Sequence, residues 1–156
     1  MTSPVAVPAS VKSEHEDLQV QLARAVREKG ALGDAARELA RVMKPHFARE
    51  EAFALPPLAL LPKIARGIVH SDMAWVINIT KRLKAEIPIM IIEHKDIAAV
   101  VNRFRTRAEE ADRDDYVHFA HALIVHAQYE EEVLYPAAVL VGEYVALKLA
   151  QHTETV

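Results

Sequence analysis

Two short segments place a histidine and a glutamate four residues apart within apolar sequence. One segment, HFAREEAFALPP, begins at His46, and the other, HAQYEEEVLYPA, begins at His126. Residues i and i+4 lie on the same face of a helix, so His46 would project beside Glu50 and His126 beside Glu130. Imidazole and carboxylate groups are suitable ligands for iron or zinc, and the spacing therefore indicates a metal site.

A lone histidine precedes each of these segments. His15 lies in EHEDL and His94 lies in EHKDI, and the intervals to the next His-Glu pair agree within one residue. In both units the midpoint of that interval falls in a turn sequence, KGALG or EEADRDD. Antiparallel helices joined at these turns would place each lone histidine level with its pair. The sequence thus predicts a duplicated helical hairpin with its polar residues at one level of a bundle.

Two glutamates in an apolar core require compensation. A buried carboxylate without a partner costs several kcal/mol or becomes protonated, and a pair of divalent metal ions removes that cost. A single histidine on a helix is more often a hydrogen-bonded structural residue, and a single His-Glu pair is common by chance. The agreement of both units in register favours metal binding. The predicted metal ligands are His15, His46, Glu50, His94, His126 and Glu130.

The other histidines have no counterpart in the repeat. We expect none of the four to bind metal: His70, His118, His121 and His152. Among them, His118 is the one expected to contact a metal-binding residue without binding the metal itself. Glu51 and Glu131 follow the paired glutamates by one residue, about 100° round the helix, and should face solvent or support a ligand. Tyr129 and Tyr135 lie within reach of the site or its rim, but packing is their expected role.

Turn and proline-rich segments separate the helices that would position these residues. Apolar residues at intervals of three and four predict helices on both sides of KGALGD and of EEADRDD. LPPLALLPKIARG predicts an irregular connector, followed by a helix from about Ser71. We expect Pro88 to kink or break that helix, Pro45 to bend the second helix, and Pro136 to precede a last helix. The predicted fold is all-α, an antiparallel up-and-down four-helix bundle with an extra helical connector and a C-terminal helix.

Composition restricts the class of protein. The 156 residues are 51% hydrophobic and suit one domain, with a flexible tail at 1–10, the bundle at 11–150 and a C-terminal tail at 151–156. The net charge of −3 gives no reason to expect nucleic acid or an anionic membrane as a partner. Without cysteine, disulfides and thiolate metal sites are excluded. No long apolar run or signal peptide is visible, so a cytoplasmic location is expected. Apolar surfaces on the helices around Trp75 and after Pro136 are compatible with a homodimer.

The combined pattern of EHEDL, HFAREE, EHKDI and HAQYEEEVLYP resembles the hemerythrin-like, His-His-Glu (HHE) cation-binding domains over about residues 11–136. The resemblance implies a four-helix bundle that holds two iron ions in an oxo- or hydroxo-bridged di-iron centre. By position it implies that His15 and His46 bind one iron and that His94 and His126 bind the other. Glu50 and Glu130 would bridge the two irons.

One departure from the oxygen-carrying hemerythrins affects the expected activity. Those proteins have a second histidine one turn from the third-helix histidine, where this chain has Met90 and Ala98 around His94. Four histidines are closer to the di-iron domain of the repair-of-iron-centres proteins. Counting donors leaves one open position on each iron. We therefore expect a protein that binds or reduces O2, peroxide or nitric oxide with an unidentified electron donor. The alternatives are a metal-handling or zinc-filled structural bundle and a metal-free helical interaction module.

Overall fold

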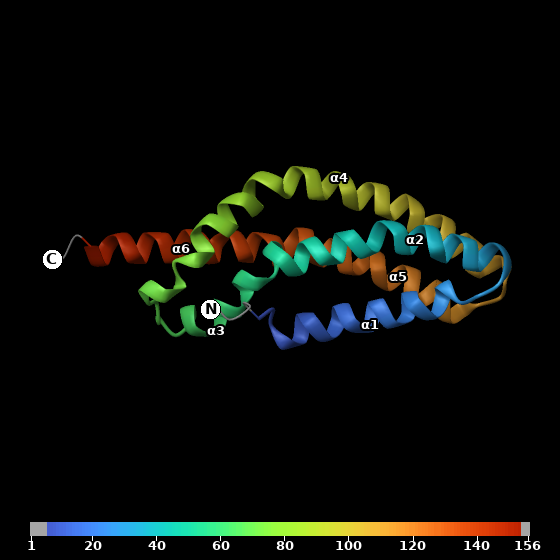
Figure 1. Ribbon diagram of the computed structural model, residues 1–156, viewed down its shortest axis with the longest axis horizontal. Coiled ribbons are helices and arrows are strands. Elements are labelled where there is room, and N and C mark those ends of the chain that lie inside the picture. Colours follow the sequence, from blue (N-terminus) through green and yellow to red (C-terminus); the bar gives the residue numbers. More distant parts are fainter. Residues whose placement is uncertain (1–5, 154–156) are drawn as a thin grey trace.

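Four long helices form a bundle in the computed structural model, which describes residues 6–153. They are α1 (Ala9–Val26), α2 (Gly30–Arg49), α4 (Trp75–Glu110) and α5 (Asp114–Tyr129). A short helix, α3 (Leu61–Ile64), lies in the connector, and α6 (Tyr135–Thr153) extends beyond the bundle (Figure 1). No strand occurs among the described residues, and the predicted helical bundle is confirmed.

The apolar residues predicted from the helical period form the core between these helices. On α2, for example, Leu39, Met43 and Phe47 recur at intervals of four and are buried. They pack with Phe104 of α4 and Phe119 of α5 in one cluster. Each bundle helix contacts its hairpin partner, and α2 also contacts α4 while α1 also contacts α5. The two hairpins are therefore joined side by side into a closed bundle.

Both predicted turns fall between the helices of a hairpin. In the first, Gly30 has φ of +66°, which glycine adopts without steric cost. In the second, Asp112 has φ of +51°, a conformation that Asp tolerates better than most residues. The carbonyl oxygen of Ala108 accepts a hydrogen bond from the backbone N–H of Arg113 across this turn. Turn chemistry therefore sets the register in which each lone histidine meets its pair.

A π-helical turn begins at each of the paired glutamates. These turns are η1 (Glu50–Ala54) and η4 (Glu130–Leu134). In η1 the backbone N–H of Leu55 donates to the carbonyl of Glu50, and in η4 that of Tyr135 donates to Glu130. A proline follows each turn, at Pro56 and Pro136, and cannot donate a hydrogen bond of its own. After η1 the chain leaves the bundle through a 3₁₀ helix, Pro56–Leu60, whereas after η4 it continues as α6.

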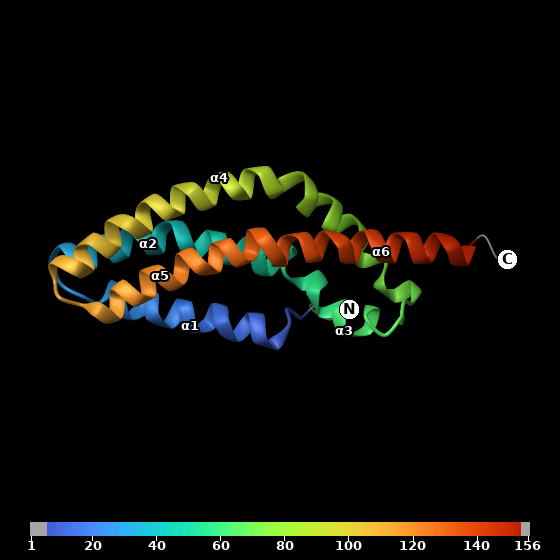
Figure 2. The same cartoon turned by 180° about the vertical axis from the view of Figure 1, so that it is seen from behind.

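Of the kink or break expected at Pro88, the break does not occur, because α4 continues through this residue from Trp75 to Glu110. The ribbon is instead bowed, and its first half curves over α6 (Figures 1 and 2). Proline removes one backbone hydrogen bond and crowds one carbonyl, and a bend accommodates both effects. Leu83 and Met90 remain fully buried on either side of Pro88, so packing holds the helix together. Pro45 likewise lies inside the continuous helix α2.

The predicted C-terminal helix is α6, and it follows α5 and η4 without a break. The chain is helical without interruption over Asp114–Thr153, which joins α5, η4 and α6. By length and composition this run is apolar enough to cross a membrane, with a mean hydropathy of 1.5, and 39% of its most apolar window is buried within the protein. The same run supplies much of the bundle core and carries His126 and Glu130.

The tails predicted at 1–10 and 151–156 are only partly covered by the structure. Helix α1 begins at Ala9, two residues inside the predicted N-terminal tail, and α6 runs to Thr153. Residues 1–5 and 154–156 lie outside the described residues.

Candidate metal centre

All six residues proposed as metal ligands lie together in the middle of the bundle. His15 comes from α1, His46 from α2, His94 from α4 and His126 from α5, while Glu50 and Glu130 begin the two π-turns. His15, Glu50 and Glu130 are completely buried, and none of the other three is more than 5% exposed. The apolar cluster around Phe104 lies on one side of this polar layer and a second one around Leu83 and Met90 on the other.

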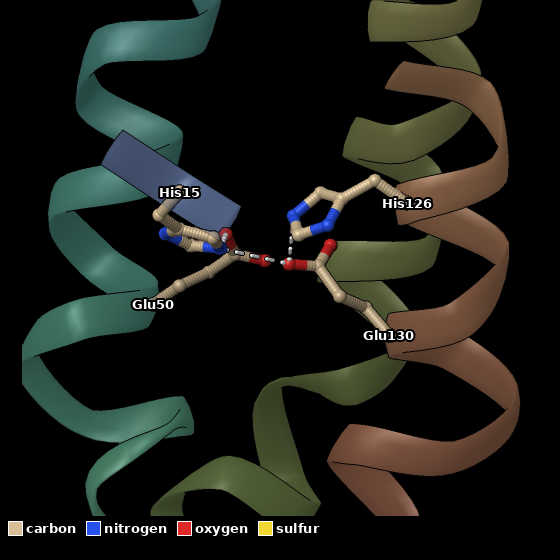
Figure 3. A group of neighbouring side chains, drawn as sticks. All are labelled: His15, Glu50, His126 and Glu130. Carbon is tan, nitrogen blue, oxygen red and sulfur yellow. Dashed lines mark ion pairs between the residues drawn. The ribbon is translucent and has the colours of Figure 1, made fainter. Parts of the chain in front are cut away.

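The six side chains form two groups that share both glutamates. In the His15 group, donor atoms of His15, Glu50, His126 and Glu130 lie within 4.8 Å of one another. In the His46 group the same holds for His46, Glu50, His94 and Glu130. Figure 3 shows the His15 group, whose imidazoles and carboxylates point toward one another from different helices.

This grouping corrects the pairing that the family resemblance implied. His15 was expected to share a metal with His46, and His94 with His126, but each histidine is grouped with one from the other hairpin. The reason is the arrangement of the helices. Helix α1 lies against α5 and α2 against α4, so each group forms where two hairpins meet.

In the His15 group, the inward-facing atoms have no hydrogen-bond partner. Of six such buried atoms among the described residues, four belong to this group: His15 Nε2, Glu50 Oε2, His126 Nε2 and Glu130 Oε1. His126 Nε2 lies 2.8 Å from Glu130 Oε1, and His15 Nε2 lies 3.4 Å from the same oxygen, without hydrogen-bond geometry. Buried polar atoms are normally paired, so four unpaired donors converging on one point fit a metal ion.

The His46 group has a similar layout with closer contacts. His46 Nε2 lies 3.0 Å from His94 Nε2 and 3.1 Å from Glu50 Oε1. His94 Nε2 lies 3.3 Å from Glu130 Oε2. Each glutamate thus turns one oxygen to each group, which is the arrangement of a bridging carboxylate.

Each of the four histidines faces a further carboxylate with its other ring nitrogen. The Nδ1 atom of His15 contacts Glu51 at 3.2 Å, that of His94 contacts Glu131 at 2.8 Å, and that of His126 contacts Glu14 at 3.0 Å. The Nδ1 atom of His46 lies 3.6 Å from Glu93. A carboxylate on Nδ1 fixes the tautomer that leaves Nε2 free for a metal. We call Glu14, Glu51, Glu93 and Glu131 the outer carboxylates.

Two of the outer carboxylates, Glu51 and Glu131, were expected to face solvent or support a ligand, and they do the latter. The other two were not predicted from the sequence. Glu14 and Glu93 received no role, although the Glu-His dipeptide in both EHEDL and EHKDI was a visible signal. Each serves the histidine of another helix, which the sequence cannot show. Arg49 in turn holds Glu93 by an ion pair.

Burial and the two carboxylates perturb the acid–base behaviour of the metal-free site. Burial raises the pKa of Glu50, and the nearby charge of Glu130 raises it further. Burial also acts to raise the pKa of Glu130, but contacts with the four histidines outweigh it and lower that pKa well below its usual value. Burial alone would lower the pKa of His46 and of His126. Contact with Glu130 and the charge of Glu50 instead raise them to about 10 and about 9. Without metal, the site therefore retains protons.

Tyr135 belongs to the site, contrary to the packing role expected for it. Its ring is completely buried and stacks on His94, with centroids 5.8 Å apart. Its hydroxyl donates to Glu50 Oε1 and lies 3.4 Å from His94 Nε2. Burial, followed by the charge of Glu50, raises the pKa of this phenol, which keeps it protonated. Tyr129, by contrast, is 44% exposed.

The expected role of His118 beside a ligand is wrong. Its side chain is exposed, and Nδ1 contacts the carbonyl of Asp114 one turn earlier in α5. His70, His121 and His152 are also exposed, and none of the four is in either group of candidate ligands.

The family comparison agrees with this geometry. The family model of the hemerythrin HHE cation binding domain matches residues 8–138. The chain therefore belongs to the hemerythrin HHE cation-binding family, and it carries a buried His/Glu group suited to a metal cation. Neither the curated proteins nor the solved structures that were compared with it gave a match.

Proposed function

We propose that this protein is a non-haem di-iron protein that binds or reduces a small oxidant such as O2, peroxide or nitric oxide. The observation that carries the proposal is the set of four buried, unpartnered donor atoms in the His15 group. A second group that shares the same two glutamates supports two ions rather than one. Imidazole with carboxylate oxygen is a donor set suited to iron.

The residues of the chain have defined tasks in this proposal. The Nε2 atoms of the four histidines would hold the ions from the sides, and Glu50 and Glu130 would bridge them. Two ferrous ions held in this way would supply the electrons for reducing a small oxidant. The outer carboxylates would orient the imidazoles, and because their side chains are 32–44% exposed, they would also pass protons between the histidines and solvent. The apolar clusters on both sides would restrict the access of bulk water.

A zinc-filled structural bundle would use the same donors, because zinc also accepts imidazole and carboxylate. Metal analysis of protein purified without added metal, together with its absorption spectrum, separates the two. We expect two irons per chain and near-ultraviolet absorption from the diferric form. Zinc at the same stoichiometry without this absorption would contradict the proposal.

The bridging role of the glutamates is tested by Glu50→Ala and Glu130→Ala. Each variant should lose at least one metal ion per chain, while its helical circular dichroism persists, since alanine is a good helix former. Glu132→Ala is the matched control, because Glu132 is exposed in the same π-turn as Glu130. Two ions retained in both bridging variants would exclude the proposed ligand set.

A further inference from the structure

The hydroxyl of Tyr135 lies among the donor atoms of the His46 group. It contacts Glu50 Oε1 directly, lies 3.4 Å from His94 Nε2 and lies 3.5 Å from Glu130 Oε2. These are three of the four donor atoms that would surround a metal in this group. The hydroxyl is therefore not at the rim but among the candidate donor atoms of the His46 group.

Two contacts of His46 in this group match the spacings of a six-coordinate ion. With metal–ligand bonds of about 2.1 Å, adjacent donors in an octahedron are about 3.0 Å apart and opposite donors about 4.2 Å apart. His46 Nε2 lies 3.0 Å from His94 Nε2 and 4.0 Å from Glu130 Oε2, so these contacts correspond to one adjacent and one opposite pair. The separations of 3.4 and 3.5 Å between the Tyr135 oxygen and the donor atoms of His94 and Glu130 are nearer to the adjacent spacing than to the opposite one. Its contact with Glu50 Oε1 is a hydrogen bond of the metal-free site.

The π-turn η4 is what brings this side chain to the site. In a regular α-helix, Tyr135 would lie about 140° round the axis from Glu130, five residues earlier. The wider turn closes with a hydrogen bond from Tyr135 N–H to the carbonyl of Glu130, so these two residues come closer to one face.

We propose that Tyr135 is a fifth protein ligand of the metal in the His46 group, bound through its phenolate oxygen. The inference depends on the iron centre proposed above and adds an asymmetry to it. When the metal binds, the phenol O–H bond is exchanged for an oxygen–metal bond. The proton leaves to solvent with those displaced from the histidines. A metal cation favours this exchange because it reverses the local electrostatics that keep the phenol protonated.

The other hairpin of the repeat has no tyrosine at the position that corresponds to Tyr135. Leu55 is the residue that corresponds to Tyr135, because both follow a bridging glutamate by five positions and precede a proline. Leu55 is completely buried and has no donor atom. The metal of the His15 group therefore has one protein ligand fewer. A small oxidant would therefore bind at the open coordination position of the metal in the His15 group. Tyr135 would fill the corresponding position on the metal of the His46 group.

The test uses the whole 156-residue chain loaded with ferrous iron and then oxidised in air. Phenolate bound to ferric iron gives a visible charge-transfer band and enhances tyrosine ring modes in resonance Raman spectra. Tyr135→Phe removes only the hydroxyl. Tyr116→Phe is the matched control, because Tyr116 is also buried and its hydroxyl donates to a glutamate, Glu28, at 2.8 Å, outside the metal groups.

We expect two irons per chain and the visible band in the wild type and in Tyr116→Phe. Tyr135→Phe should lose the band, and nitric oxide bound by the ferrous protein should rise from one to two equivalents. Two irons without tyrosine modes in the wild type, or a band unchanged in Tyr135→Phe, would overturn the inference and leave the proposed function intact. Two equivalents of nitric oxide on the wild type would also overturn it. A chain without iron would overturn both.

Discussion

Each imidazole of the metal centre lies between an inner carboxylate and an outer one. His15 has Glu130 on its Nε2 side and Glu51 on its Nδ1 side, and His94 has Glu130 and Glu131 in the same roles. An outer carboxylate that accepts a hydrogen bond from Nδ1–H would leave Nε2 free to bind a metal and would increase its basicity. We therefore expect the outer carboxylates to affect how well the site binds metal, although none of them would touch it.

Glutamine in place of an outer carboxylate should weaken metal binding. Glu51→Gln and Glu131→Gln keep a hydrogen-bond acceptor but remove the negative charge, so we expect the affinity to fall about 10–100-fold. Titration against a competing chelator measures the effect. Glu132→Gln, an exposed position next to Glu131, should stay within about twofold of the wild type. Equal affinities in all three variants would mean that the outer carboxylates have no such role.

The protons held by the metal-free site should make its stability fall as pH rises. The pKa values of His46 and His126 are raised from 6.5 to about 10 and about 9. A raised pKa stabilises the folded state fully below pH 6.5, and this stabilisation is lost as pH rises through the folded-state values. Metal competes with the same protons, so its affinity should increase over that range. Melting of the metal-free protein and metal titrations at pH 6.5 and 9.5 measure both effects. A metal-free protein that became more stable with pH would contradict this assignment.

At the scale of the elements, the two π-turns and the contact between α4 and α6 position the site. The π-turns present Glu50 and Glu130 and turn the following residues inward. Helix α6 anchors the bowed first half of α4 where Gly142 meets Thr80. A Cβ atom at Gly142 would lie 1.6 Å from Thr80 Oγ1 and 2.5 Å from its Cβ. Only glycine permits this close approach of α6 to α4.

Gly142→Ala should therefore destabilise the protein without removing a ligand. Forcing a methyl group into a close-packed contact costs about 1–3 kcal/mol of unfolding free energy. Chemical denaturation measures this loss, and the metal content should stay unchanged. Combining Gly142→Ala with Thr80→Ala removes two of the three nearest atoms and should recover part of the stability. Wild-type stability in Gly142→Ala would show that the two helices separate at no cost.

At the scale of the whole molecule, the metal centre lies between two apolar clusters. One cluster fills the bundle toward the hairpin turns, and the other joins η1, α4 and the start of α6. The centre is the polar layer where residues from α1, α2, α4 and α5 meet. Metal binding at this layer should therefore stabilise the entire bundle rather than one helix.

Removal of metal should lower the melting temperature. A ligand at 100 times its dissociation constant stabilises the folded state by about 2.7 kcal/mol. For a chain of this size that amounts to roughly 5–10 °C. Differential scanning calorimetry with and without chelator tests this expectation. Glu130→Ala should show a smaller shift than the wild type, because it binds fewer metal ions, and a shift equal to that of the wild type would point to metal bound elsewhere.

Much of the fold and the candidate site could be predicted, because the signals are local. His15 and His94 are level with their His-Glu pairs because helical rise and turn position fix the register of a hairpin. The helical period identified the core positions, such as Leu39 and Phe104. The chain stays helical through Pro88 and Pro136, because packing on both sides of a proline can hold a helix together.

The sequence by itself determined the hairpin repeat and the six residues at its polar level. Spacing along a helix and chemistry at a turn are properties of neighbouring residues, and both can be read from the sequence. Only the tertiary structure decided that His15 is grouped with His126 and His46 with His94, and that Glu14 and Glu93 serve histidines of other helices. It also brought Tyr135 to the site through a π-turn that shifts the helical phase. These contacts between residues of different helices depend on how each helix is rotated about its axis and packed against its neighbours. The spacing of residues along the sequence does not specify that rotation.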